Sequence, residues 1–272
     1  MYRKRFGLTC HPLPKNAQGK TFYDKSPGYQ SFARHFQALL DDPGLGVLTA
    51  EPGLGKTAAV RNLCAHLPQP EYMVLYQCDT AVSPLDLYRT LAHELGVKPS
   101  HRRAQLWVDI KKALVHMVDE RGTSPVMILD EAQHLSDHFL CDLSGFLNFA
   151  FDSRDLLTLW LVGLSPLAAR LRMRQHAALT MRVAAQVHLE PLGRDVFAQM
   201  LEHALKAAGA QQKLFSDPAV EQLFRASRGI PRQTAKLVRA ALRLAHERDQ
   251  SFVDDLIVAA VVEDYAALAG TA

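Results

Sequence analysis

Short apolar runs alternate with longer amphipathic segments over residues 29–191 of the chain. The run at 126–129 is wholly apolar, which is typical of a strand buried on both faces. Comparable runs occur at 46–49, 72–76, 156–162 and 183–189. Helical patterns lie between them, at 29–40, 56–67, from Pro84 onward, 103–120 and 136–151. This alternation predicts a parallel sheet that is covered by helices.

The pattern changes near Pro191. Beyond it no strand is indicated, and helices are expected near 194–208, 216–227, 231–247 and 252–268. We therefore predict an α/β fold in which an αβα sandwich with a central parallel sheet occupies 29–191. A small all-helical C-terminal domain follows at 192–272, and an irregular basic segment precedes the sandwich at 1–28.

Composition narrows the class of protein only modestly. Hydrophobic residues make up 48% of the 272 positions and charged residues 22%, as expected of a folded globular chain. The net charge of +3 does not by itself indicate a nucleic-acid partner, although 1–20 and 170–182 carry basic residues and no acid. The four scattered cysteines favour free thiols, and no signal peptide or membrane-spanning run is found. We therefore expect a cytoplasmic protein without membrane contact.

A glycine-rich turn lies between an apolar run and a predicted helix, at 50–57. It matches the pattern G-x-x-x-x-G-K-[ST], except that Ala50 takes the first position. In such a loop the backbone N–H groups surround the β-phosphate of ATP, and the following helix presents its positive end. Lys56 would reach the β- and γ-phosphates, and Thr57 would bind Mg²⁺. The residues expected to contact nucleotide are Pro52, Gly53, Leu54, Gly55, Lys56, Thr57 and Ala58.

Two carboxylates follow the apolar run at 126–129. The carboxyl ends of parallel strands face the ligand crevice, so Asp130 and Glu131 are expected there. Asp130 would hold Mg²⁺ through water, and Glu131 would act as the general base that polarises the attacking water. A strand followed by an ordinary Asp-initiated turn is the alternative interpretation, but the phosphate loop upstream makes it less attractive.

With these motifs the chain resembles the AAA+ ATPases, and more narrowly the branch of ExeA-type secretion ATPases and the TniB, TnsC and, more distantly, MuB transposition helpers. The resemblance covers almost the whole chain and includes the segments 2–8, 26–28, 161–163 and 189–192. Its most specific parts are the string Asp-Glu-Ala-Gln-x-Leu at 130–135 and the string Gly-Ile-Pro-Arg at 229–232.

The resemblance implies an αβα core and a helical lid, with ATP and Mg²⁺ bound between them. It implies that Arg232 senses the γ-phosphate and that Arg182 is the arginine finger that completes a neighbouring subunit's site. Arg172 and Arg174 are rivals for the second role, and a solvated helix face is the alternative for each arginine. A positive group at the γ-phosphate stabilises charge in the transition state.

The chain departs from the family just beyond the predicted strand that ends at Gly163. The family presents a polar sensor residue there, whereas this chain has Leu164 followed by Ser165. Either Ser165 takes the role with a small shift or the sensor is missing. Slow or partner-dependent hydrolysis is therefore one hypothesis.

Resemblance to the transposition helpers also implies contacts with double-stranded DNA. Loops in this part of the core line a DNA channel in those proteins, which makes Thr80, Arg102 and Arg103 candidates for phosphate contacts. An ordinary solvated helix start is the equally weighted alternative for the arginines.

A zinc site is a further, less favoured interpretation. His134, His138 and Cys141 have the i, i+4, i+7 spacing of one helical face. Surface histidines on a polar helix explain the same pattern without a metal.

Three functions are compatible with the sequence. The first is a homo-oligomeric ATPase, ring or filament, that assembles on DNA and regulates transposition by recruiting a transposase. The second is an ExeA-like ATPase of envelope assembly; that type carries a membrane segment and a peptidoglycan-binding region, and neither follows the lid here, which favours the first. The third is a nucleotide switch without DNA contact.

Overall fold

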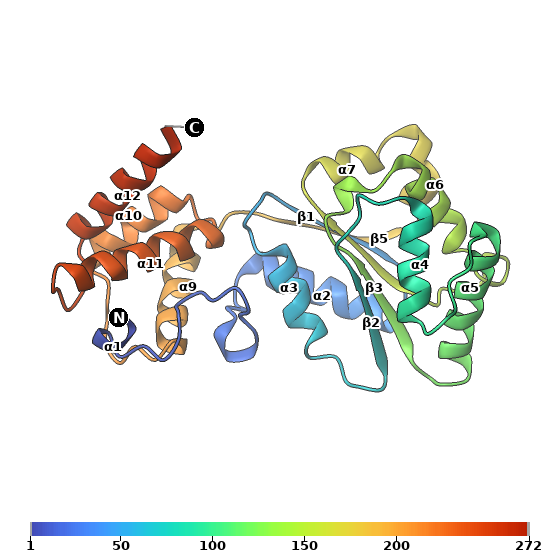
Figure 1. Cartoon of the computed structure of the whole chain (residues 1–272), viewed down its shortest axis with the longest axis horizontal. Coiled ribbons are helices and arrows are strands. Elements are labelled where there is room, and N and C mark those ends of the chain that lie inside the picture. Colours follow the sequence, from blue (N-terminus) through green and yellow to red (C-terminus); the bar gives the residue numbers. More distant parts are fainter. Residues whose placement is uncertain (1, 271–272) are drawn as a thin grey trace. The chain divides into compact units, whose positions relative to one another are not determined.

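The computed structural model describes residues 2–270, with side chains described as far as Tyr265. The chain divides into two compact units. Among the described residues, one comprises 28–51 and 63–189, and the other comprises 2–27, 52–62 and 190–270. Each is described separately below, and Figure 1 shows their elements along the chain.

A five-stranded sheet forms the centre of the first unit. The strands are β1 (Leu45–Ala50), β2 (Tyr72–Gln77), β3 (Ser124–Leu129), β4 (Thr158–Gly163) and β5 (Val183–Leu189). Their order is β2-β3-β4-β1-β5, and every neighbouring pair is parallel. The predicted strands and the predicted parallel sheet are thus confirmed. All five carboxyl ends consequently lie at one edge of the sheet.

One face of the sheet is covered by α4 (Pro84–Glu94), α5 (Arg103–Asp119) and α6 (Asp137–Phe146), which Figure 1 shows together on one side of the strands. Alternate strand residues such as Met127, Leu129 and Leu161 join side chains of these helices in one apolar core. Consecutive strand residues point to opposite faces of the sheet. The residues between those named therefore face the other side of the sheet, which needs its own cover.

The opposite face is covered by α2 (Pro27–Asp41). Its Phe32 and Phe36 rings lie with their centroids 4.9 and 5.9 Å from that of Trp160 in β4. Gly46 of β1 leaves the room for Trp160, since an added Cβ would lie 2.6 Å from the indole ring. Helices on both faces explain why the strands contain apolar runs rather than a strict alternation.

Between α6 and β5 the structure departs from the predicted boundaries. The helix expected at 136–151 ends at Phe146, and Phe149 then turns into the core. The next three residues, 150–152, have left-handed backbone angles, and Asn148 Oδ1 accepts a hydrogen bond from the Asp152 N–H at 3.0 Å. The short helices α7 (Pro166–Leu171) and α8 (Ala177–Thr180) were not predicted.

The second unit contains the C-terminal helices α9 (Arg194–Ala207), α10 (Asp217–Ser227), α11 (Pro231–Glu247) and α12 (Asp255–Gly270). Their apolar faces form one core, into which the N-terminal segment also inserts. The short helix α1 (Tyr2–Arg5) contributes Tyr2, Phe6 and Leu8 follow it into this core, and Arg5 forms an ion pair with Asp249.

Within the described residues, no helix is both long enough and apolar enough to span a bilayer.

Replacing Gly46 by Ala should destabilise the protein, because overpacking of a core costs about 1–3 kcal/mol. Urea denaturation measures the loss. Gly44→Ala is the matched control, since its added Cβ would meet its nearest neighbours at ordinary contact distances of 3.4 and 3.5 Å. Equal unfolding midpoints for the two variants would show that the Trp160 ring yields without cost.

Candidate nucleotide-binding site

The glycine-rich turn leads from β1 into α3 (Lys56–Cys64). Gly53 and Gly55 have φ angles of 89° and 92°, a left-handed conformation that glycine adopts readily. Ala50 is the last residue of β1, so its extended backbone suits alanine and the departure from glycine is harmless. Lys56 is buried at the first position of α3, and Thr57 is exposed beside it. Strand, loop and helix therefore follow one another as a phosphate-binding turn requires.

The string Gly-Ile-Pro-Arg lies against this turn, within the same compact unit. The Arg232 N–H donates to the Gly53 carbonyl at 3.2 Å. A Cβ on Gly53 would lie 3.0 Å from Arg232 Cβ and from Ile230 Cγ2. Gly229 has a φ of 70° and approaches the Leu192 backbone so closely that a Cβ would lie 2.2 Å from its carbonyl oxygen. The two glycines thus allow Arg232, whose side chain is exposed, to start α11 beside the phosphate loop.

Asp130 lies at the carboxyl end of β3 and is 3% exposed. Its Oδ2 accepts from the Tyr76 hydroxyl at 3.0 Å, and its Oδ1 accepts from the Glu131 N–H at 2.9 Å. Burial and then the Asp130 charge raise the pKa of Tyr76, so its hydroxyl keeps the proton that it donates. Sequence reasoning missed Tyr76, because only the pairing of β2 with β3 brings it here.

Glu131 is exposed and has a left-handed backbone with φ of 55°. Its Oε2 accepts from Gln133 Nε2 at 2.7 Å, and its carbonyl accepts from the Thr80 hydroxyl at 2.7 Å. Gln133 Oε1 in turn accepts from the Leu164 N–H at 3.0 Å, just beyond β4. The carboxylate of Glu131 is therefore tied, through one glutamine, to the end of the neighbouring strand.

Ser165, the proposed replacement for the sensor, donates to Glu51 Oε1 at 2.6 Å. Glu51 is the residue that follows β1. The hydroxyl therefore lies at the edge of the sheet where the phosphate loop begins. Its role as sensor stays a prediction.

Arg182 lies directly before β5, at the amino end of the strands. It donates to Asp152 Oδ1 at 2.6 Å. This is the edge of the sheet opposite to Asp130, which follows the carboxyl end of β3. Its rivals Arg172 and Arg174 are exposed near the end of α7.

The structure corrects one of the three candidate DNA contacts. Thr80 is only 1% exposed and its hydroxyl is bonded to the Glu131 carbonyl, so it is a structural residue of the acidic turn. Arg103 forms an ion pair with Asp142 and lies 4.9 Å from the centroid of the Trp107 ring. Arg102 is exposed.

The three residues of the possible zinc site do not share one helical face. His134 lies in a short 3-10 helix at 132–134, whereas His138 and Cys141 lie on α6. Across the described residues, no group of three or more His, Cys, Asp or Glu side chains is placed to hold a metal ion.

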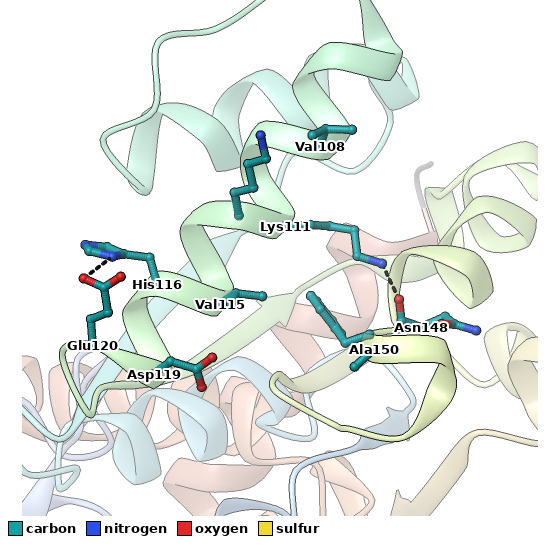
Figure 2. Close-up of a pocket in the computed structure, with 10 residues that line it drawn as sticks. Val108, Lys111, Val115, His116, Asp119, Glu120, Asn148 and Ala150 are labelled. Carbon is teal, nitrogen blue, oxygen red and sulfur yellow. Dashed lines mark hydrogen bonds and ion pairs between the residues drawn. The ribbon is translucent and has the colours of Figure 1, made fainter.

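A cavity of about 530 Å³ lies along α5, and Figure 2 shows its lining. Lys111 donates to the Asn148 carbonyl across it, and its Nζ lies 4.4 Å from the centroid of the Phe149 ring. Asp119 and Glu120, at the end of α5, place this cavity near the amino end of β3. It is therefore remote from Asp130 and Glu131, at the other end of the strand.

Comparison with known proteins agrees with this arrangement. Residues 39–171 match the family described as AAA domain. Over 250 residues the chain is 30% identical to General secretion pathway protein A of Aeromonas hydrophila, a match that covers 91% of this chain but only 45% of that protein.

Solved structures share the fold at low sequence identity. The ORC2 protein of Aeropyrum pernix, in ADPNP–ADP complexes, superposes with a TM-score of 0.70 at 16% identity, over 95% of this chain and 72% of that one. Drosophila ORC bound to DNA gives a TM-score of 0.68 at 16% identity, over 96% and 64%.

The parallel sheet, the phosphate-binding turn and the matches to an AAA domain and to solved structures define the AAA+ P-loop αβα fold. Within that class the chain is related in sequence to General secretion pathway protein A.

Replacing Gly53 by Ala should cost more stability than replacing Gly55 by Ala. Both alanines bear the left-handed strain of about 1–2 kcal/mol, but only the one at Gly53 also meets Ile230 and Arg232. A Cβ on Gly55 meets nothing within 4 Å. Thermal unfolding of the nucleotide-free variants measures the difference. An equal loss would mean that Arg232 does not pack on the loop in solution.

Proposed function

We propose that the chain hydrolyses ATP at the carboxyl edge of its sheet. The observation that carries this proposal is that the phosphate-binding turn continues β1 and the acidic pair continues β3, two parallel strands of one sheet. Lys56 and the backbone N–H groups of the turn bind the β- and γ-phosphates, and Arg232 contacts the γ-phosphate.

The acidic turn fits a hard cation. Asp130 is buried, and the bonds from Tyr76 and from the Glu131 N–H orient its two oxygens. Carboxylate and hydroxyl oxygens are the ligands that Mg²⁺ prefers, and Asp130 and Thr57 are the residues proposed to hold the ion. Bound Mg²⁺ would neutralise charge on the phosphates.

Glu131 is the exposed member of the acidic pair and is suited to act on water. Its carboxylate accepts a proton as the water oxygen attacks the γ-phosphorus, and the bond from that phosphorus to the β–γ bridging oxygen breaks. ADP and phosphate are the products.

We further propose that copies of the chain assemble as a ring or a filament. Arg182 directly precedes β5 at the amino edge of the sheet, opposite to the edge at which the acidic pair follows β3. It completes the site of a neighbouring copy by contacting the γ-phosphate, with Arg172 and Arg174 as the alternatives. ATP that is bound across this interface then stabilises the assembly.

Double-stranded DNA is the proposed partner of that assembly, which would regulate transposition by recruiting a transposase. Lys236, Arg239 and Arg243 share one face of α11, and the charges of Arg239, Arg243 and Arg3 of α1, after burial, lower the pKa of His11. These cations therefore lie close together. Together with the predicted contacts Arg102 and Arg103 they are the candidate phosphate contacts, in place of the buried Thr80. A solved neighbour bound to DNA adds support.

A role in secretion or envelope assembly is the second candidate. The 30% identity to General secretion pathway protein A favours it. It shares the ATP chemistry but requires no DNA.

Lys56→Ala should abolish ATP binding, because the charge that faces the β- and γ-phosphates is lost. Glu131→Gln should bind ATP but stall hydrolysis and prolong the ATP-bound assembly. Fluorescent-nucleotide titration and light scattering after ATP is consumed measure the two effects. Wild-type affinity in Lys56→Ala, or normal disassembly in Glu131→Gln, would contradict the respective assignment.

Salt-dependent binding of duplex DNA separates the two candidate roles. With an ATP analogue we expect binding that weakens with salt. The logarithm of the binding constant should fall with the logarithm of the salt concentration, with a slope of about −0.9 for each phosphate contact. Changing Lys236, Arg239 and Arg243 together to Gln should flatten the slope by up to about 2.7. Fluorescence anisotropy measures both.

The matched control changes the same number of cations elsewhere in the helical unit, at Lys206, Lys213 and Arg225. Each of these is already paired with a carboxylate. Absence of DNA binding by the wild-type chain at low salt would favour the secretion role. Equal slopes for the two triple variants would remove α11 from the DNA surface.

A further inference from the structure

The side-chain amide of Gln133, two residues beyond the acidic pair, forms hydrogen bonds through both its nitrogen and its oxygen. Gln133 donates from Nε2 to Glu131 Oε2 at 2.7 Å, and its Oε1 accepts the Leu164 N–H at 3.0 Å. The first bond involves a carboxylate, so it is stronger than one between neutral groups. The second fixes the amide to backbone at the end of β4.

Gly163 provides the room for this amide. A Cβ at 163 would lie 2.8 Å from Gln133 Oε1, which is closer than carbon and oxygen approach without displacement. Gly163 ends β4, where a side chain would otherwise point at the glutamine. The absence of a side chain at this position is thus a second, independent sign that the amide has a fixed place.

Arg170 of α7 fixes the backbone on which Gln133 stands. Its guanidinium donates to the Gln133 carbonyl at 2.7 Å, to the Leu135 carbonyl at 2.8 Å and to Asp137 Oδ1 at 2.5 Å. The bond from Arg170, followed by that from buried His176, lowers the pKa of Asp137 and keeps it charged. The turn therefore cannot shift without breaking several charge-assisted bonds.

We propose that Gln133 is a positioning residue for the hydrolysis reaction, which directs the Glu131 carboxylate toward the attacking water. This inference rests on the ATPase activity proposed above. Glu131 is exposed, and an unrestrained glutamate would sample many rotamers. The Gln133 amide restrains it by one oxygen, Oε2, and leaves Oε1 able to accept the proton. Leu164 can hold the Gln133 amide although its side chain is apolar, because its backbone N–H donates the hydrogen bond.

Gln133→Ala should lower kcat by about tenfold to a hundredfold, the loss expected when a catalytic group is displaced by about 1 Å. KM and the affinity for ADP should stay within about twofold, since the two bonds of the Gln133 amide are to Glu131, the proposed general base, and to the Leu164 N–H. Gln105→Ala is the matched control. It removes a similar bond, from Gln105 Nε2 to Asp109 at 2.8 Å on α5, and should leave kcat unchanged.

Gly163→Ala tests the same contact without altering the glutamine. It should lower kcat by displacing the amide, and the double variant with Gln133→Ala should be no slower than the slower single variant. Such non-additivity is expected of two changes that break one interaction. If the fold-losses in kcat of the two single variants multiplied in the double variant, Gly163 would act independently of Gln133.

A third measurement does not depend on turnover. The NMR signal of the Gln133 side-chain amide can be assigned in selectively labelled protein, because it is lost in Gln133→Ala. We expect this signal to shift in Glu131→Ala. An unchanged signal would overturn the inference whatever the activity. A wild-type chain without ATPase activity would contradict the proposed function, whereas wild-type kcat in Gln133→Ala would contradict this inference alone.

Discussion

Parallel pairing of five strands that are buried on both faces is the constraint from which the other features follow. The strands β3 and β4 each pair with a neighbour on both sides within an apolar interior, where an unpaired charge would be costly. Polar chemistry is therefore confined to the strand ends, and parallel direction gathers one set of ends at one edge. The same direction sends the residue before β5, Arg182, to the other edge of the sheet.

Close packing within each of the two units depends on positions where a side chain is missing. Gly53, Gly163 and Gly229 each admit a neighbouring group that a Cβ would displace: the start of α11, the Gln133 amide and the Leu192 backbone. Gly46 has the corresponding role for Trp160 inside the sandwich. Because interiors are packed as densely as crystals, such sites fix where polar groups stand as firmly as hydrogen bonds do.

The elements and the phosphate-binding turn were predictable because their signals are local. An apolar run such as 126–129 or a glycine pattern such as 50–57 needs no tertiary information. The end of α6 was not predictable from the sequence, because Phe149 packs into a core that is formed by other elements. Thr80 illustrates the same limit: in a polar loop it resembles a surface residue, and only the packing of β2 beside β3 buries it under Glu131.

The two carboxylates of the acidic pair differ in environment although they are adjacent in sequence. Asp130 is buried and oriented by hydrogen bonds to both oxygens, which suits a ligand whose geometry must not change. Glu131 is exposed and restrained by one side chain, which suits the general-base role proposed for it. The left-handed backbone of Glu131 produces this difference, because it turns the chain away from the strand immediately after Asp130. A tight turn of one residue thus converts a repeated acidic sequence into two chemically distinct groups.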